Sequence, residues 1–493
     1  MNAVAEALFR VPPFPRATPF PIVRPGRTTD VSAPELIAAI RRERVGGETW
    51  GADDPWQRFD RHEPLRLGGD DPMALLATIA GCPVVIDGSG PFADLSSLET
   101  LVAQHLIAQT SWHDPFSGEP ASPLHVVARL GAWRRLIDAN RAVAAAYGFA
   151  AWKQDTVAAM LWNGRDSSIF ASANDTHLAQ IPPDKAIAVW KARVPADFLA
   201  ELEQSGRPLL EVEDGFIRSI GLGADCVPPL SIAVDDLGAH YDPSRPSRLE
   251  RLLAEDEPDA QSLARARALR EIIAAMGISK YGVGGDPLPR PAGTRRHVLV
   301  VGQVEDDRSV RLGGCGLASN HELLRRVRTR CPDAYILYRP HPDVEAGHRK
   351  GHVPHAEALR LADAIDPGSA ISALIAMVDE VHVLTSLAGF EALLHGKAVI
   401  THGIPFYAGW GLTTDLGPVP ARRGRRRTLD QLVAAVLIDY PRYLDPTTGL
   451  PCDAELLITR MGAGVRREKA ALVALRKVVG RLNRLVARIR TRR

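Results

Sequence analysis

YILYRPHPDVEAG at residues 335–347 and VHVLTSLAGFEALLHGKAVITHGIPFYAGWG at residues 381–411 decide how this chain folds. The second stretch predicts one βαβ unit. A short apolar strand at Val381–Leu384 precedes a helical pattern at Leu387–Leu394, and another strand follows at Ala398–Thr401. The first stretch predicts a further buried strand of the same sheet.

Polar residues stand at the carboxyl ends of two of these predicted strands. Thr385 and Ser386 occupy the place of a helix N-cap after one strand, and Arg339 and His341, in the sequence Arg-Pro-His-Pro, follow the other. Ligands of open α/β sheets collect at strand carboxyl ends, and the exposed N–H groups at a helix start suit a phosphate. We therefore expect an anion site between these two polar segments.

The composition is that of a large globular protein. The 493 residues are 45% hydrophobic and 24% charged, enough for about two to four domains. A net charge of +2 argues against a dedicated nucleic-acid binder, and five scattered cysteines indicate reduced thiols rather than a disulfide frame or a zinc site. No apolar run approaches the ~20 residues of a membrane-spanning helix, and the proline-interrupted start lacks a signal-peptide core. We expect a cytoplasmic protein whose membrane contact is at most peripheral.

An internal repeat divides the chain. SLETLVAQHLIAQTSWHDPFSGEP at residues 97–120 aligns without a gap with TLDQLVAAVLIDYPRYLDPTTGLP at residues 428–451, sharing Leu-Val-Ala, Leu-Ile, Asp-Pro and the final Gly-x-Pro. Residues 1 to about 60 are rich in Pro, Gly and charge, which predicts an extended arm. We interpret residues 1–121 as an N-terminal extension and the remnant of an upstream module.

Acidic residues end a strand of the first α/β lobe, which we place at residues 122–290. The strand Pro208–Val212 leads into Glu213-Asp214-Gly215. At the carboxyl end of a strand these acids would face the crevice of the sheet. Asp-Gly is also common in ordinary turns and near helix caps. Spacing alone therefore leaves two interpretations open, a site facing the crevice and a turn or cap without a function.

The second lobe, residues 291–427, begins with the buried strand HVLVVGQ, which brings Gln303, Asp306 and Asp307 to its tip. Asp306 and Asp307 could hold a divalent ion. Two acidic residues without further ligands nearby in sequence are more often a helix cap or hydrogen-bond acceptors for a substrate. Two Rossmann-like lobes joined by a glycine-rich hinge and closed by residues 428–464 predict an α/β fold of the GT-B type, in which the lobes face a cleft.

Other residues have both an ordinary and a functional interpretation. Four histidines lie near one another in the sequence: His341, His348, His352 and His355. Their uneven spacing favours side chains that are solvated or contact a phosphate over side chains that bind a metal. Glu391, inside the helix after Ser386, is either a surface glutamate or an acceptor for ribose hydroxyls. The aromatic run from Phe406 to Trp410 predicts packing that forms the floor of the crevice.

Five strings carry a resemblance to a known family: EDGFIRSIGLG (213–223), PPLSIAVDDLGAHYD (228–242), VGQVEDD (301–307), YRPHPD (338–343) and TSLAGFEALLHGKAVITHGIPFYAGWGLT (385–413). In this order they resemble the capsular polysaccharide β-Kdo transferases, bacterial enzymes that use CMP-Kdo to build a linker on a phosphatidylglycerol-type lipid. The resemblance covers about residues 105 to 455. Larger family members are tandem two-module proteins, whereas this chain has one complete module. It also carries Ala239-His240 where relatives more often have aromatics.

The resemblance implies a glycosyltransferase in capsular polysaccharide biosynthesis and export, which moves Kdo from CMP-Kdo to a lipid-linked or Kdo-terminated acceptor with retention. It extends to bacterial sialyltransferases, whose acidic-acidic-Gly, His-Pro and Ser/Thr motifs are similar in kind and order to Glu213-Asp214-Gly215, His341-Pro342 and Thr385-Ser386. His341, the two hydroxyls and helix N–H groups would stabilise the departing CMP, so neither a metal nor another cofactor is expected.

Asp214 has two possible roles if the residues are considered alone. It would be a general base in an inverting enzyme or the nucleophile in a retaining one. The resemblance implies retention, which makes Asp214 the nucleophile and leaves Glu213 or Asp307 as the proton acceptor.

The remaining site residues are assigned to the sugar. Arg218 and Arg339 are candidates for the Kdo carboxylate, because a bidentate guanidinium fits a planar carboxylate. Gln303 and Asp306 would bind sugar hydroxyls.

The last segment, residues 465–493, predicts a basic amphipathic helix. It either packs on a lobe or attaches to an anionic inner-membrane surface, where each exposed cation adds roughly 1 kcal/mol. The expected partners are a CMP-sugar donor and a glycolipid or oligosaccharide acceptor, without nucleic acid. Two other functions stay open: a transferase for another CMP-ulosonate or a UDP-sugar, and a non-catalytic scaffold in polysaccharide assembly.

Overall fold

The computed structural model describes residues 3–28, 30–165, 168–172, 176–221, 227–280, 282, 288–347 and 349–465. The chain divides into two compact units: unit 1 (Met1–Ala144, Asp155–Ile169 and Thr447–Pro451) and unit 2 (Ala145–Gln154, Phe170–Pro446 and Cys452–Arg493). The predicted basic helix lies, apart from Val465, outside the described residues, as does His348. No helix within the described ranges is both long and apolar enough to cross a lipid bilayer.

Unit 1 is built from short elements: α1 (Ala3–Leu8), β1 (Val23–Pro25), α2 (Ala33–Glu43), α3 (Pro55–Phe59), β2 (Leu65–Gly68), α4 (Pro72–Ala80), β3 (Val84–Asp87), α5 (Leu98–Val102), β4 (Thr110–Trp112) and α6 (Pro123–Asn140). Strand β1 pairs antiparallel with β4, and β2 pairs parallel with β3. The expected extended arm at residues 1 to 60 is therefore wrong. Leu36 and Ile40 of α2 have no exposed surface, because α2 packs against α6, far along the chain.

The repeat found in the sequence is also a repeat of structure. In each copy an α-helical turn (α5; α17, Leu429–Val433) continues as a π-helix (Ala103–Ala108; Ala434–Asp439) and then a strand (β4; β16, Pro441–Leu444). Corresponding side chains make corresponding hydrogen bonds: Trp112 Nε1 donates to Leu106 O at 2.8 Å, and Tyr443 Oη donates to Leu437 O at 2.7 Å. The two copies thus share their backbone path and its side-chain support. That residues 1–121 are a remnant of an upstream module stays a prediction.

One of the two larger sheets in the described part of unit 2 is parallel throughout, with strand order β12-β11-β10-β13-β14-β15. Numbered from β10, this is the Rossmann order 3-2-1-4-5-6, whose switch point lies between its first and fourth strands. Its strands are β10 (His297–Val301), β11 (Tyr335–Arg339), β12 (Ala364–Ile365), β13 (Glu380–Val383), β14 (Ala398–Thr401) and β15 (Thr414–Asp415). The carboxyl ends of β10 and β13 therefore meet where a ligand is expected.

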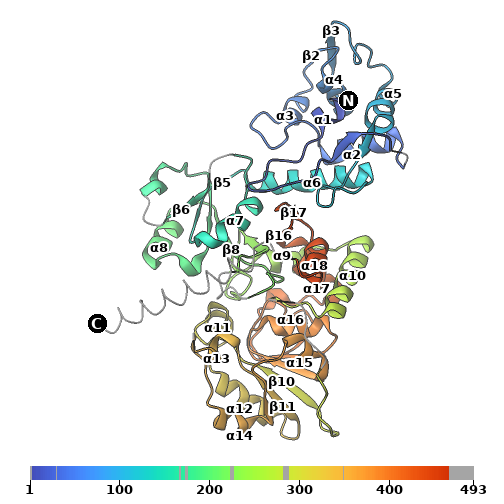
Figure 1. The fold of residues 1–493 in the computed structure, drawn as a ribbon. Helices are drawn as coiled ribbons and strands as arrows, with labels where there is room; N and C mark the ends of the chain where they lie inside the picture. The colour runs from blue at the N-terminus through green and yellow to red at the C-terminus, as the bar shows by residue number, and fades with distance from the viewer. Residues whose placement is uncertain are drawn as a thin grey trace. The chain divides into compact units, whose positions relative to one another are not determined.

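Helices cover both faces of this sheet, which explains why β10 and β13 are buried along their whole length. In Figure 1, α12 and α14 lie to one side of β10 and β11, and α15 and α16 to the other. The helices are α11 (Arg308–Gly313), α12 (Asn320–Arg330), α13 (Pro342–Glu345), α14 (His355–Leu361), α15 (Ile371–Met377) and α16 (Leu387–Leu394). The βαβ unit predicted from sequence is confirmed: Ser386 caps α16, and Gly396, at φ 68°, ends it.

The other larger sheet is mixed, with strand order β17-β16-β9-β8-β7-β5-β6 in the described residues. Its strands are β5 (Val143–Tyr147), β6 (Phe170–Ala171), β7 (Ala186–Val189), β8 (Leu209–Asp214), β9 (Ser231–Asp235), β16 and β17 (Pro451–Cys452). Strand β8 runs parallel to β7 and antiparallel to β9. An α/β fold is confirmed, and this sheet is mixed rather than parallel throughout, because antiparallel β9 and β16 extend it.

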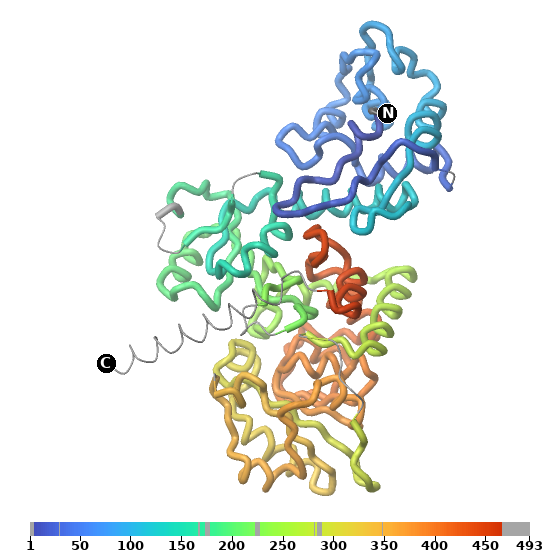
Figure 2. Tube along the Cα trace, in the orientation of Figure 1, coloured from blue at the N-terminus to red at the C-terminus, as the bar shows by residue number. Residues whose placement is uncertain are grey.

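The other helices are α7 (Ala151–Met160), α8 (Ala196–Gln204), α9 (Arg248–Glu255), α10 (Ala260–Met276), α17 and α18 (Ala454–Gly462), of which α18 packs against β16. Figure 2 follows the chain as it returns near its end from the parallel sheet to the mixed one. There β16 pairs with β9, with Pro441 opposite Ala233 and Tyr443 opposite Ser231. The closing segment thus belongs to the mixed sheet, although it follows the parallel one in sequence.

Candidate active site

A cavity of about 330 Å³ in unit 2 is lined by residues that end or follow strands of both larger sheets. Seven of the predicted site residues line it: Glu213, Asp214, Gln303, Asp307, His341, Thr385 and Ser386. The cavity therefore unites the acids at the end of β8 with the polar residues after β10, β11 and β13. We call it the catalytic pocket.

The parallel sheet contributes a set of hydrogen-bonding groups at its switch point. Gln303, after β10, accepts the Thr385 N–H at Oε1 (2.8 Å) and donates from Nε2 to Thr385 Oγ1 (3.1 Å), which joins the ends of β10 and β13. Ser386 Oγ accepts the N–H of Ala388 as the N-cap of α16 (3.2 Å). These contacts hold the start of α16 beside the pocket, where its first N–H groups and macrodipole favour an anion.

His341 enters the same set from β11. Its Nδ1 accepts the Asp343 N–H at 3.1 Å, so the proton of the neutral ring is on Nε2. Burial lowers the pKa of His341 below its ordinary value. His341 lines the pocket, and a neutral imidazole with its proton on Nε2 is suited to donate a hydrogen bond to a phosphate oxygen.

Asp214, the last residue of β8, is held by two cations. Arg218 Nε lies 2.9 Å and Lys153 Nζ 3.3 Å from Asp214 Oδ1, and Lys153 also lies 3.2 Å above the ring of Trp190. Burial would raise the pKa of Asp214, but the charges of Arg218, Lys153 and Lys280 outweigh burial and hold the pKa below its ordinary value. The carboxylate is thus ionised, and with 24% of its side chain exposed it can be approached from the pocket.

Glu213, its neighbour on β8, has the opposite electrostatics. Its Oε1 accepts a hydrogen bond from Tyr241 Oη at 2.9 Å. Burial raises the pKa of Glu213 to about 7, the Tyr241 hydrogen bond opposes this, and the charge of Asp214 adds to it. Two adjacent carboxyl groups with pKa values pushed apart can divide the roles of nucleophile and proton carrier.

Four residues predicted from sequence do not line the pocket. Arg218 is fully buried and engages Asp214, Ser219 Oγ and Val227 O, and that it binds a donor carboxylate stays a prediction. The others also have protein partners: Asp306 pairs with Arg349 (3.0 Å), Arg339 donates to Asp366 O (3.0 Å), and Glu391 accepts the Lys280 N–H (2.9 Å).

Sequence reasoning gave no site role to three polar residues at or beside the pocket, Lys153, Tyr241 and Lys280, and named His240 only as a departure from its relatives. His240 and Tyr241 lie within one of the recognised strings, where their adjacency to the motif was the available signal. Lys153 and Lys280 stand in segments without a motif. The predicted aromatic floor is present in part, since Phe406 lines the pocket with Phe216 at a ring distance of 4.7 Å, while Tyr407 and Trp410 are buried.

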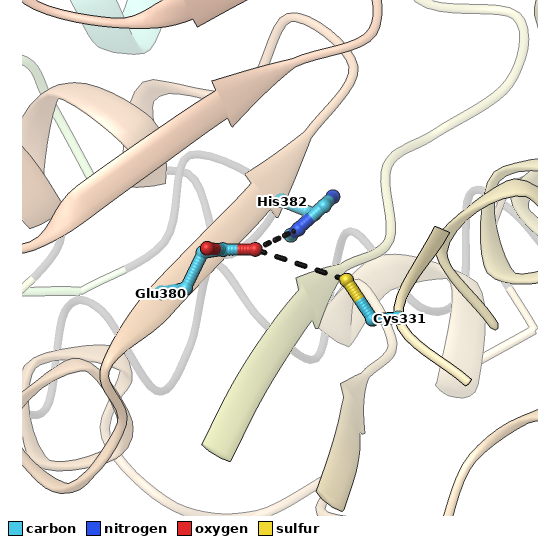
Figure 3. A group of neighbouring side chains, drawn as sticks. All are labelled: Cys331, Glu380 and His382. Carbon is cyan, nitrogen blue, oxygen red and sulfur yellow. Dashed lines mark hydrogen bonds and ion pairs between the residues drawn. The ribbon is translucent and has the colours of Figure 1, made fainter. Parts of the chain in front are cut away.

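A group of possible metal ligands lies elsewhere in the parallel sheet (Figure 3). Among the described residues, Cys331, Glu380 and His382 have donor atoms within 4.8 Å of one another. His382 Nε2 lies 2.6 Å from Glu380 Oε1, and Arg296 contacts both Glu380 Oε2 (3.1 Å) and Cys331 Sγ (3.2 Å). The guanidinium already supplies the positive charge that an ion would bring, so we assign no metal to this group. The absence of a catalytic metal stays a prediction.

Comparison with known proteins connects this geometry to a family. The family model described as "Capsule polysaccharide biosynthesis protein" matches residues 185–281 and 287–443, more than half of the chain. The chain belongs to this family. The matched segments contain every described residue that lines the catalytic pocket.

Curated relatives share the family's sequence over much of the chain. The chain is 40% identical over 361 residues to the capsule polysaccharide modification protein LipA of Neisseria meningitidis serogroup B. The matched region covers 73% of the chain and 51% of LipA. It is 40% identical to the lipopolysaccharide-processing protein LpsZ of Rhizobium meliloti, covering 66% of the chain and 76% of LpsZ. The chain thus spans about half the length of LipA and three quarters of LpsZ.

Two solved structures resemble the chain. Both are from Thermosulfurimonas dismutans KpsC: its β-Kdo 2,4 transferase (TM-score 0.56, 32% identity) and its β-Kdo 2,7 transferase (TM-score 0.52, 34% identity). The matches cover 65% and 64% of this chain and 98% of each solved chain. At 32% and 34% identity and TM-scores above 0.5, these Kdo transferases share both sequence and fold with about two thirds of the chain.

Proposed function

We propose that this protein is a retaining glycosyltransferase, which moves Kdo from CMP-Kdo to a lipid-linked or Kdo-terminated acceptor in capsular polysaccharide biosynthesis. The observation that carries the proposal is that Asp214 and Glu213, from one sheet, line the same pocket as His341, Thr385 and Ser386, from the other. The names of the two similar solved structures, both Kdo transferases, support the same reaction. In the GT-B arrangement that we propose, the two sheets belong to lobes that face each other across this pocket.

The donor would lie with its nucleotide on the parallel sheet. Its phosphate would meet the start of α16, the hydroxyls of Thr385 and Ser386, and the Nε2–H of His341. These donors stabilise the extra negative charge that CMP gains as it departs, and preorganised donors in a pocket are effective because they need no reorientation. The sugar would extend toward the acids at the end of β8.

The first step is attack by Asp214. A carboxylate oxygen of Asp214 bonds to the anomeric carbon while the bond from that carbon to the phosphate oxygen breaks, and CMP leaves with the bonding electrons. Arg218 and Lys153 keep Asp214 ionised for this role. The product is a glycosyl-enzyme of inverted configuration.

The second step transfers the sugar to the acceptor. An acceptor hydroxyl attacks the same carbon, its proton passes to Glu213, and Asp214 leaves as a carboxylate. The second inversion restores the β-configuration. A pKa of about 7 suits Glu213 for this proton, since a base works best when its pKa lies near the working pH. Asp307 is the weaker candidate because its carboxylate caps α11, accepting from Ser309 N and Oγ.

The test is transfer by Asp214→Ala. Purified protein would be incubated with CMP-Kdo and a synthetic Kdo-terminated acceptor, with products identified by mass spectrometry and NMR and CMP affinity measured by calorimetry. We expect Asp214→Ala to abolish transfer while CMP still binds, and Glu213→Gln to accumulate a glycosyl-enzyme visible in the intact mass.

The matched control is Asp306→Ala, which removes a nearby acid outside the pocket and should keep most of the activity. No transfer by the unaltered protein from any CMP-sugar would refute the proposed function and favour a scaffold. Full activity of Asp214→Ala would remove this residue from the mechanism. Transfer from a UDP-sugar in preference to CMP-Kdo would refute the donor assignment.

A further inference from the structure

The charge of the catalytic pocket is uneven. Among the described residues that line it, Lys280 is the only lysine or arginine, whereas Glu213, Asp214 and Asp307 contribute carboxyl groups. The two histidines of the lining do not add positive charge at neutral pH, because burial lowers the pKa of His341 and brings that of His240 to about 3. Lys280 is therefore the cation with which an anion in this pocket would pair.

The backbone holds Lys280 between the two polar sides of the pocket. Its N–H donates to Glu391 Oε1 (2.9 Å) on α16, the helix that Ser386 caps. Its carbonyl accepts the N–H groups of Arg218 (3.0 Å) and Ser219 (3.3 Å), in the segment that follows β8. The charge of Lys280 lowers the pKa of both Asp214 and His341, so its ammonium acts on both sides of the pocket.

A CMP-ulosonate brings two negative groups to this site: its phosphate, and a carboxylate bonded to the anomeric carbon itself. The sugar of an aldose nucleotide has no such carboxylate. That carboxylate must come close to the attacking carboxylate of Asp214, and like charges repel strongly in a partly desolvated pocket. Neither of the two arginines that sequence reasoning assigned to the donor carboxylate lines the pocket, whereas Lys280 does.

We propose that Lys280 binds the anomeric carboxylate of the donor and thereby selects ulosonate donors over aldose nucleotides. The inference rests on the proposed function of the pocket and goes beyond it by naming the group that recognises the donor class. Lysine suits this position because its compact ammonium has three N–H donors, so it can face the donor carboxylate and Asp214 together. Glu391 acts as a positioning residue, since its carboxylate fixes the backbone from which Lys280 extends.

The test is equilibrium binding, which needs no turnover. Calorimetry would compare three probes: CMP, a hydrolysis-resistant CMP-Kdo analogue, and the same analogue with a neutral carboxamide in place of the carboxylate. They would be titrated into the unaltered full chain, Lys280→Met and Lys280→Arg. Lys280→Met keeps the length of the side chain and removes its charge, and thermal unfolding of each variant would verify the fold.

We expect Lys280→Met to weaken the carboxylate analogue roughly 10- to 100-fold, the range for loss of a charged hydrogen bond. CMP and the carboxamide should bind within about threefold of their original affinity, and Lys280→Arg should restore much of the loss. An equal loss for CMP would overturn the inference, because Lys280 would then bind the phosphate. Unchanged binding of all three probes, or an equal loss for carboxylate and carboxamide, would overturn it as well.

Failure of the proposed function has a different signature. A protein that binds the carboxylate analogue through Lys280 but transfers nothing to any acceptor would refute the transferase and leave the recognition of ulosonates standing. A protein that transfers Kdo without a carboxylate-specific loss in Lys280→Met would refute only the role of Lys280. Transfer assays with CMP-Kdo and a UDP-aldose, run on the same samples, separate the two outcomes.

Discussion

Removing the Tyr241 hydroxyl should shift the pH dependence of transfer to higher pH. Tyr241 Oη donates to Glu213 Oε1 at 2.9 Å and so stabilises the ionised form of a carboxyl group whose pKa is about 7. A hydrogen bond to a charged group contributes about 1.5–3 kcal/mol, and one pKa unit corresponds to about 1.36 kcal/mol. Tyr241→Phe should therefore raise the pKa of Glu213 by roughly one to two units.

The sign follows from the role of Glu213. As the proton acceptor it must be ionised, so the rate falls as the pH drops below its pKa. The acceptor reacts with the glycosyl-enzyme, in which Asp214 is an ester and no longer carries the charge that adds to the pKa of Glu213, so the midpoint of the ascending limb in the unaltered protein should lie below about 7. In Tyr241→Phe the midpoint should lie roughly one to two units higher than in the unaltered protein, and the activity lost at lower pH should recover in alkali.

The assay is kcat/KM for the acceptor at saturating CMP-Kdo, measured from acid to alkaline pH for the unaltered protein, Tyr241→Phe and Tyr335→Phe. The last variant removes a hydroxyl from β11 outside the pocket lining and should leave the profile in place. A uniform loss at every pH in Tyr241→Phe would indicate a structural role for the hydroxyl. A midpoint that stays in place or moves to lower pH would refute the assignment of Glu213 as the base.

Two further predictions concern stability. Gly389→Ala, on α16, would place a Cβ 2.2 Å from the Oη of Tyr407, whose hydroxyl donates to the Ser386 carbonyl. We expect the free energy of unfolding, measured with urea, to fall by about 1–3 kcal/mol and CMP to bind more weakly. The control Gly368→Ala, with open space around its Cβ, should be nearly neutral. A wild-type urea midpoint for Gly389→Ala would show that Tyr407 gives way without cost. Burial lowers the pKa of His402 from 6.5 to about 3, so the unfolded chain binds a proton there that the folded chain does not, and stability should fall as the pH drops from about 6.5 towards 3. At pH 5 the free energy of unfolding should be lower by roughly 2 kcal/mol because of His402 alone. His402→Gln should therefore lose less stability between pH 7 and pH 5 than the unaltered protein. An equal loss in both would assign the acid sensitivity to other groups.

The parallel sheet and its switch point were predictable because their signals are local. Continuous apolar runs, the Ser386 N-cap and Gly396 at the helix end act within a few residues of one another, and Ala398–Thr401 is observed with the predicted bounds. The same local pattern failed near the start of the chain. Helix α2 is buried because α6, α5 and α4 pack against it. Its local signals, a capping box from Ser32 to Glu35 and an apolar face at helical spacing, were outweighed by the proline, glycine and charge of the segments around it.

The sequence by itself determined which motifs of the parallel sheet would meet at strand ends: Gln303 after β10, His341 after β11 and Thr385-Ser386 after β13. Parallel strands place their carboxyl ends together, so order along the chain was enough for these three. That the acids at the end of β8, in the other sheet, line the same pocket was decided by the tertiary structure. Only the tertiary structure decided the electrostatics of the pocket. Lys153, Tyr241 and Lys280 reach the two acids from distant segments, Arg218 turns to Asp214 rather than outward, and burial separates the pKa values of Glu213 and Asp214. Charge interactions and desolvation depend on distance in space, and spacing along the chain does not encode that distance.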